Sequence, residues 1–363
     1  MCSSFRVVDF KPDETQAELR TLASEVLARE AAQARLEEHE KSGRPYDTGT
    51  WKAMAQAGLI GACLPEEAGG AGLGPLEMAV ILREAGAHVA PVPALPSLVA
   101  GLVVARHGTA AQREALAPLA EGDAVLTFAV REPGAGLAEA PTATARGGRV
   151  SGRAGLVPYA AEASAVLVPA RVEGAGTALF LVRPGAAGIR PVTLSTGEPA
   201  GVVTLDDAPA EMVGEPDGRA AESLRLHALA GITATASGVL AGALALTTGY
   251  IRTRRQFDRV LAEFQAVTMQ IADVYIAARA VDVAMWAGVW RLAEGLPAQE
   301  DLAVAAHNAA DAGLRALYTC QHLHGGIGLD VTYPLHRYFA WGKNAAHLLG
   351  GAEAQLDLIG APA

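Results

Sequence analysis

The sequence predicts a mostly helical α+β protein with helices at both ends and a small β domain between them. Two observations predict this class. Long segments with apolar residues at spacings of three and four open and close the chain, and short runs rich in β-branched residues lie between them. A chain of 363 residues exceeds one small core. We therefore expect a helical domain over residues 1–121, a β domain over 122–216 and a helical bundle over 217–363.

The N-terminal part is expected to be helical from residue 12 to residue 120. "ETQAELRTLASEVLAREAAQARLEEHE" and "GPLEMAVILREAGAHV" both carry an apolar stripe with helical spacing, and Pro and Gly clusters separate them. Between Ala124 and Asp207 the pattern changes to short runs typical of strands and hairpins. These runs are "AVLTFAV", "TATA", "RVSG", "SAVLVPAR", "TALFLVR" and "GVVTL".

The C-terminal part predicts four helices, at residues 220–253, 262–295, 299–323 and 334 to about 360. Long helices with short connections form an antiparallel bundle. The stretch from Leu226 to Ile251 contains no Asp, Glu, Lys or Arg and is long enough to span a bilayer. Its Ser and Thr content, its recurring small residues and the lack of a second span favour a helix buried in the bundle.

Composition limits the function. A net charge of -10 and a pI near 5.4 argue against nucleic-acid binding, which requires clustered Lys and Arg. The three cysteines have no CxxC spacing, which fits reduced thiols. Charged residues occupy the N-terminus where a signal peptide would be apolar. We expect a cytoplasmic protein that binds neither nucleic acid nor membranes.

Three stretches could bind a ligand. "TRRQFDRVLAEFQAV", from residue 253, contains the densest basic cluster, and guanidinium groups bind phosphate in a planar, bidentate way. "HGGIG", from residue 324, interrupts helical periodicity with glycines that let a ligand approach the backbone. "CLPEEAGGAGLGPLEM", from residue 63, joins two helices. Read singly, they could equally be a solvated helix end, a helix C-cap and a structural loop.

Together and in this order, these stretches resemble the acyl-CoA dehydrogenase family over nearly the whole chain. "LPEEAGGAGLG" resembles its Pro-Glu-Glu-x-Gly-Gly-x-Gly loop, and "REPGAG" its flavin-contacting Thr-Glu-Pro segment. "GRAGLVPYAAEASAVLVPA" resembles the strand pair that covers the flavin. "RRQFDRVLAEFQAV" resembles the Arg-x-x-Phe and Phe-Gln signature, and "HLHGGIG" the Gln-x-His-Gly-Gly-x-Gly signature.

The resemblance implies an N-terminal helical domain, a middle β barrel or sandwich and a C-terminal four-helix bundle through which subunits pair. It implies FAD between the β domain and the bundle of one subunit, completed by its neighbour. It also implies removal of an α-proton of an acyl-CoA by a carboxylate while hydride passes to the flavin. By position, the residues that would contact the neighbour's FAD are Arg254, Phe257, Gln265, His322, Gly325 and Gly326. His322 stands where the family usually has Gln.

The chain's own flavin pocket departs from the family pattern. Arg131 replaces a Thr, Leu137 and Ala138 replace a Ser-Asp pair, and Leu156 replaces an aromatic residue. A hydroxyl that would contact the flavin has become a long cation, and a polar contact has become aliphatic. These losses around one cofactor indicate a degenerate pocket.

The catalytic base is also missing at its usual place. That place, before the last helix, is Gly350. Glu353 lies three residues further, about 300° around a helix and roughly 4 to 5 Å along it, so we expect a first-turn acid facing the helix dipole. Some relatives carry the base on the first bundle helix, but the neighbourhood of Ala228 has no acid nearer than Glu222. His227 could in principle act as a base, but we expect a satisfied histidine at a helix start.

The leading hypothesis is therefore a base-lacking subunit of a hetero-oligomer. The pattern resembles the α2β2 acyl-CoA dehydrogenases of actinobacteria that act on CoA thioesters of steroid or cholesterol side chains. The partner would be a second acyl-CoA dehydrogenase subunit that supplies the base, and an electron-transfer flavoprotein would accept the electrons. Two alternatives remain open at this point. One is a self-sufficient homo-oligomeric flavoprotein with a relocated base such as Glu353, and the other is a non-catalytic structural subunit.

Overall fold

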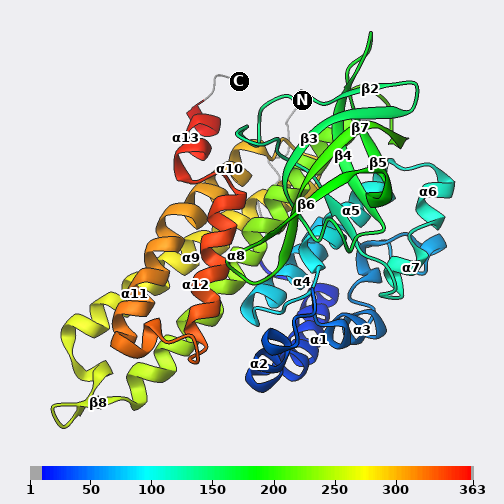
Figure 1. Cartoon of the computed structure of the whole chain (residues 1–363). Coiled ribbons are helices and arrows are strands. Elements are labelled where there is room, and N and C mark those ends of the chain that lie inside the picture. The colour runs from blue at the N-terminus through cyan, green and yellow to red at the C-terminus, as the bar shows by residue number, and fades with distance from the viewer. Residues whose placement is uncertain (1–9, 361–363) are drawn as a thin grey trace.

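The computed structural model describes residues 10–360, and this part of the chain begins with the expected helices (Figure 1). Asp13 caps the first of them: its carboxylate accepts from the Gln16 backbone N–H, and the Gln16 side chain accepts from the Asp13 N–H. The N-terminal elements are α1 (Glu14–Glu30), α2 (Gln33–Ser42), α3 (Thr48–Gln56), η1 (Gly61–Cys63), η2 (Glu66–Ala68), α4 (Pro75–Ala87), α5 (Ala94–His107), α6 (Ala110–Glu114) and α7 (Ala117–Ala120).

Strands follow as β1 (Leu126–Phe128), β2 (Thr144–Arg146), β3 (Arg149–Pro158), β4 (Ala165–Val172), β5 (Thr177–Val182), β6 (Gly188–Thr193) and β7 (Pro199–Val213), with η3 (Pro184–Ala186) before β6. Five of them pair in a ring: β4 with β2, β2 with β3, β3 with β7, β7 with β5, and β5 with β4 again. A closed ring leaves these strands no free edge. The expected barrel is confirmed.

The bundle consists of α8 (Arg219–Thr253), α9 (Gln265–Ala293), a rod of α10 (Gln299–Asn308), η5 (Ala309–Gly313) and α11 (Leu314–His324), and α12 (Leu335–Leu348). Between α8 and α9 lie β8 (Arg255–Gln256), β9 (Arg259–Val260) and η4 (Leu261–Glu263), and η6 (Gly325–Leu329) follows α11. Because successive rods run antiparallel, residues 250–268 and 320–333 lie at one end, which we call the bundle tip. The last helix, α13 (Ala352–Gly360), lies at the opposite end (Figure 1).

Helices α4 and α8 cross with their backbones in contact. A Cβ on Gly238 would lie 1.8 Å from the Arg83 carbonyl oxygen, and one on Gly86 would lie 2.2 Å from the Thr235 carbonyl oxygen. Arg83 also donates to Asp282 of α9 at 2.9 Å. In the described part of the chain, α8 alone is long and apolar enough to cross a membrane, and 72% of its apolar window is buried inside the protein. This burial favours a core helix, as expected.

Two details differ from the sequence expectation. The helix expected from residue 334 to about 360 is wrong as a single helix, because Gly350 (φ +84) and Gly351 (φ +86) take the left-handed conformation and separate α12 from α13. Strand β6 was not expected, because its "GIRPVT" has an exposed surface and a Pro that weaken the strand pattern.

Candidate functional site

The basic cluster lies at the bundle tip, where α8 gives way to a two-stranded hairpin. Phe257 and Asp258 form its turn with φ values of +50 and +61, the left-handed pair typical of a tight hairpin. Asn and Gly favour such a turn, whereas Phe does so rarely. The Phe257 side chain is 86% exposed. A bulky apolar residue held outward in a strained conformation is a feature of binding surfaces.

The arginines of this cluster fall into two groups. Arg259 bonds Glu263 at 3.1 Å and lies 5.0 Å from the centre of the Phe264 ring, and Arg255 donates to the Asp258 carbonyl oxygen. Arg254, at the end of α8, is exposed and its guanidinium has no partner within residues 10–360. It is therefore free to bind an anion. Gln265 is exposed at the first turn of α9.

The glycine loop after α11 leaves open space. Gly325 has φ +63 and ψ -142, a conformation that glycine alone adopts readily. Gly326 has no such need, yet a Cβ built there would meet no heavy atom within 4 Å. Nothing within the described chain therefore requires glycine at position 326. His322 is exposed one turn earlier.

Aromatic stacking that the sequence analysis missed holds this loop beside the end of α8. The His324 ring stacks on Tyr250 at 4.3 Å between centres, and the Tyr250 hydroxyl donates to the His324 carbonyl oxygen at 3.3 Å. Tyr333 packs against both rings. The His324 Nδ1 bonds the Cys320 carbonyl oxygen at 2.8 Å, and burial lowers the pKa of the ring. A signal was present in the sequence, since His324 directly precedes Gly325 and Tyr250 stands about one helical turn before Arg254.

The position expected for a base lies at the other end of α12. The 14 residues of this helix separate Gly350 from the glycine loop by about 21 Å. Glu353 is exposed in the first turn of α13. His227 is buried, its Nδ1 lies 2.7 Å from the Ser223 carbonyl oxygen, and burial lowers its pKa to about 4. The described structure brings Arg254, Phe257, Gln265, His322, Gly325 and Gly326 to the tip, but neither Glu353 nor His227 joins them.

Arg131 lies against Gly350. Its Nη1 donates to the His347 carbonyl oxygen at 3.2 Å and would lie 3.6 Å from a Cβ on Gly350. Burial lowers the pKa of this guanidinium, which has no acidic partner among the described residues. Leu156, with φ +50, is half-buried on β3. At the position where the resemblance implies a hydroxyl, this chain thus carries a cation that reaches the bundle.

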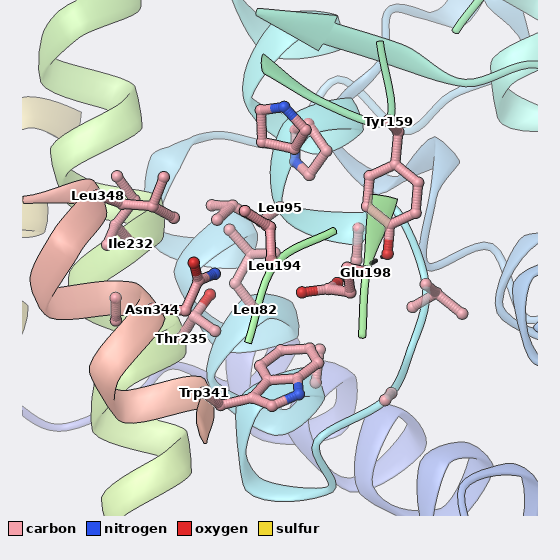
Figure 2. A pocket seen from close by; sticks show the side chains of 17 residues that line it. Leu82, Leu95, Tyr159, Leu194, Glu198, Ile232, Thr235, Trp341, Asn344 and Leu348 are labelled. Atoms are coloured by element: carbon pink, nitrogen blue, oxygen red, sulfur yellow. Dashed lines mark hydrogen bonds between the residues drawn. The ribbon is translucent and has the colours of Figure 1, made fainter. Parts of the chain in front are cut away.

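Beside this contact, the β domain, α4, α5, α8 and α12 enclose a small apolar cavity (Figure 2). Its volume of about 50 Å³ is far below the several hundred cubic ångströms of a typical cofactor site. Three fused rings do not fit. The cavity, Arg131 and Gly350 together are called the inner cleft below.

One acid lines this cavity, and the sequence analysis did not single it out. Figure 2 shows Glu198 accepting from the Tyr159 hydroxyl, at 2.7 Å; its other oxygen accepts from Thr196 at 2.9 Å. Burial raises the pKa of Glu198, and burial together with that carboxylate raises the pKa of Tyr159 well above its usual value. Glu198 and Trp341 also border a wider cleft of about 670 Å³. A lone Glu in the turn "STGEPAG" carries no distinctive sequence signal.

Comparison with known proteins decides the family. The acyl-CoA dehydrogenase N-terminal domain matches residues 13–123, and the acyl-CoA dehydrogenase C-terminal domain matches residues 220–363. The chain belongs to the acyl-CoA dehydrogenase family. The predicted resemblance and fold are confirmed, and FAD is the cofactor of this family.

Its relatives include a mycobacterial acyl-CoA dehydrogenase, a steroid ACAD and a chain of a two-protein complex. Acyl-CoA dehydrogenase FadE28 of Mycobacterium tuberculosis is 37% identical over 98% of each chain. A variant of the Tcur3481–Tcur3483 steroid ACAD is 40% identical, with a TM-score of 0.90 over 96% of this chain and 97% of that one. The ChsE4–ChsE5 complex of Mycobacterium tuberculosis contains a chain 32% identical, with a TM-score of 0.90 over 98% of this chain and all of that one. Membership supports oxidoreductase activity on a CH–CH group.

Proposed function

We propose that this chain is the flavin-site-completing subunit of an α2β2 acyl-CoA dehydrogenase that acts on a bulky, steroid-derived acyl-CoA. The observation that carries the proposal is the separation of two sets of residues. Those that resemble the flavin-binding signatures lie open at the bundle tip, while the inner cleft of the same chain is closed and about 21 Å away. A tip without a flavin of its own is suited to the flavin of a partner.

FAD, when bound, supplies the hydride acceptor for α,β-dehydrogenation of the thioester. The tip residues fit its phosphates, because Arg254 has no partner among the described residues and Gly326 leaves space for a ligand. Arg254 would neutralise the pyrophosphate through bidentate hydrogen bonds. Phe257 and Gln265 would pack beside the dinucleotide, and Gly325, Gly326 and His322 would donate hydrogen bonds.

The proton acceptor would come from the partner. Gly350 occupies the usual base position, Glu353 is exposed, and His227 is buried and satisfied. The partner is expected to be a second acyl-CoA dehydrogenase subunit, as the ChsE4–ChsE5 complex suggests. The steroid ACAD among the relatives supports a steroid acyl group. An electron-transfer flavoprotein would reoxidise the flavin in the cytoplasm.

Arg254→Ala tests this assignment in the complex co-expressed with its partner. Losing a charge-assisted bidentate contact costs about 1.5–3 kcal/mol, so FAD should bind about 10- to 100-fold more weakly. The measurement is the FAD content per complex after dialysis, by absorbance of the released flavin. Arg252→Ala is the matched control, since this neighbouring arginine is equally exposed and unpaired among residues 10–360. Full FAD content in Arg254→Ala would contradict the proposal.

A further inference from the structure

We propose that Arg131 is the residue that excludes a flavin ring from this chain's own inner cleft. The inference rests on the proposed function, because it gives a structural reason why a subunit that serves another chain's flavin would not bind a flavin of its own. The sequence analysis attributed the degenerate pocket to several substitutions. We assign the exclusion of the flavin ring to one of them, Arg131.

Arg131 connects the β domain to the bundle. The main chain of Arg131 is fixed to the β domain, because the Gly155 N–H donates to its carbonyl oxygen at 3.1 Å. Its side chain is fixed to the bundle, where Nη1 donates to the His347 carbonyl oxygen at 3.2 Å. One residue therefore spans the gap between the two layers that would have to sandwich a flavin ring.

The positive charge of Arg131 suits its position at the end of α12. His347 lies in the last turn of α12, where the carbonyl ends of the helix favour a cation. Arg131 has no acidic partner within residues 10–360 that would draw it away. A guanidinium keeps its charge at physiological pH, so the contact persists.

The guanidinium of Arg131 also fills space next to Gly350. Nη1 would lie 3.6 Å from a Cβ at position 350, so the guanidinium occupies the approach to the usual base position. A glutamate placed there would pair with Arg131 instead of facing the apolar cavity. It would also have to adopt the φ of +84 that Gly350 takes without strain. Restoring the base alone would therefore leave the cleft closed.

Ring binding can be tested with lumiflavin, which carries the flavin rings without the pyrophosphate and so does not need a partner's tip. One variant combines Leu137→Ser, Ala138→Asp and Leu156→Trp and keeps Arg131. A matched variant adds Arg131→Thr. Equilibrium dialysis, with bound lumiflavin quantified by chromatography, should show at least about tenfold tighter binding when Arg131 is replaced. Equal binding by the two variants, tight or weak, would overturn the inference.

The closure itself can be measured by hydrogen exchange in a chain altered at a single position. Arg131→Met keeps an unbranched, flexible side chain, although a shorter one, and removes its donors. The Gly350 and Gly351 amides, which bond the carbonyl oxygens of His347 and Ala346, should then exchange about tenfold faster. Arg153→Met is the control, since this exposed arginine of β3 has no contact with α12.

Unchanged exchange at Gly350 and Gly351 in Arg131→Met would show that Arg131 does not hold the turn, and would overturn the inference. Neither experiment measures FAD binding to the partner subunit. The proposed function can therefore fail through Arg254→Ala while this inference stands, and the reverse also holds.

Discussion

The bundle tip and the inner cleft contain similar residues in opposite states. At the tip, Arg254 has no partner in the part of the chain that the structure describes, and Phe257 is 86% exposed. In the cleft, Arg131 bonds a helix carbonyl, and Tyr159 is 1% exposed and bonds Glu198. An arginine and an aromatic residue are thus satisfied internally in one region and left available in the other.

The difference shows where each region finds its binding partners. Polar groups in the cleft have exchanged water for protein contacts, so a ligand would have to break those contacts before making its own. Groups at the tip are hydrated and pre-positioned by the stacked His324 and Tyr250 rings. A ligand at the tip has little protein structure to displace. At the tip, the residues that resemble the family signatures are therefore also accessible to a ligand. In the cleft, the polar residues are already bonded within the protein.

The largest effect is expected where the closed region is built, at the α4–α8 crossing. In Gly238→Ala, the new methyl would lie 1.8 Å from the Arg83 carbonyl oxygen, a backbone atom that cannot rotate away. Overpacking of this kind costs about 3 kcal/mol of unfolding free energy. Chemical denaturation measures it. Gly249→Ala in the same helix has no atom within 4 Å and should stabilise by roughly 0.5–1 kcal/mol, so equal effects would contradict the crossing.

A glycine substitution at the tip should act on the cofactor and leave stability alone. Gly326→Ala meets no atom of the described chain, so the unfolding free energy should stay within about 0.5 kcal/mol of wild type. If this glycine allows close approach of FAD, the complex should bind FAD about tenfold more weakly. Dialysis against FAD measures this. Gly185→Ala is the control, an equally open glycine far from the tip in the chain. Unaltered FAD affinity would remove Gly326 from the site.

Much of this contrast could be predicted from the sequence. Helical periodicity predicted the bundle, and the resemblance to the family implied that residues 254–265 and 322–326 serve one flavin site. The sequence pattern could not predict how the cleft closes. The contact of Arg131 with His347 joins residues that are far apart in sequence, and its distance depends on how the segment after β1 lies against the end of α12. Glu198 was missed because its burial comes from tertiary structure.

The carboxyl of Glu198 gives the cleft a pH dependence. Its folded pKa is raised above the ordinary 4.5, so the folded state binds the proton more tightly than the unfolded state. Its contribution to stability is therefore greatest below pH 4.5, and falls as pH rises through the folded pKa. Glu198→Gln lacks this titration. Urea unfolding of both proteins from about pH 4 to about pH 8 should show the wild type losing stability relative to the variant as the pH rises. A constant difference would show that Glu198 titrates normally.

The smallest effect is expected at Glu353, which belongs neither to the bundle tip nor to the inner cleft. Its carboxylate is exposed in the first turn of α13, so Glu353→Gln should change stability by less than about 1 kcal/mol through the helix dipole. Turnover of the complex should not change, because the partner supplies the base. The kcat of the complex with and without the substitution decides the matter. Removal of a general base is expected to lower kcat about a hundredfold or more. Such a loss would mean that this chain abstracts the proton itself. The contrast between the open tip and the closed cleft would then not reflect different roles of the two subunits.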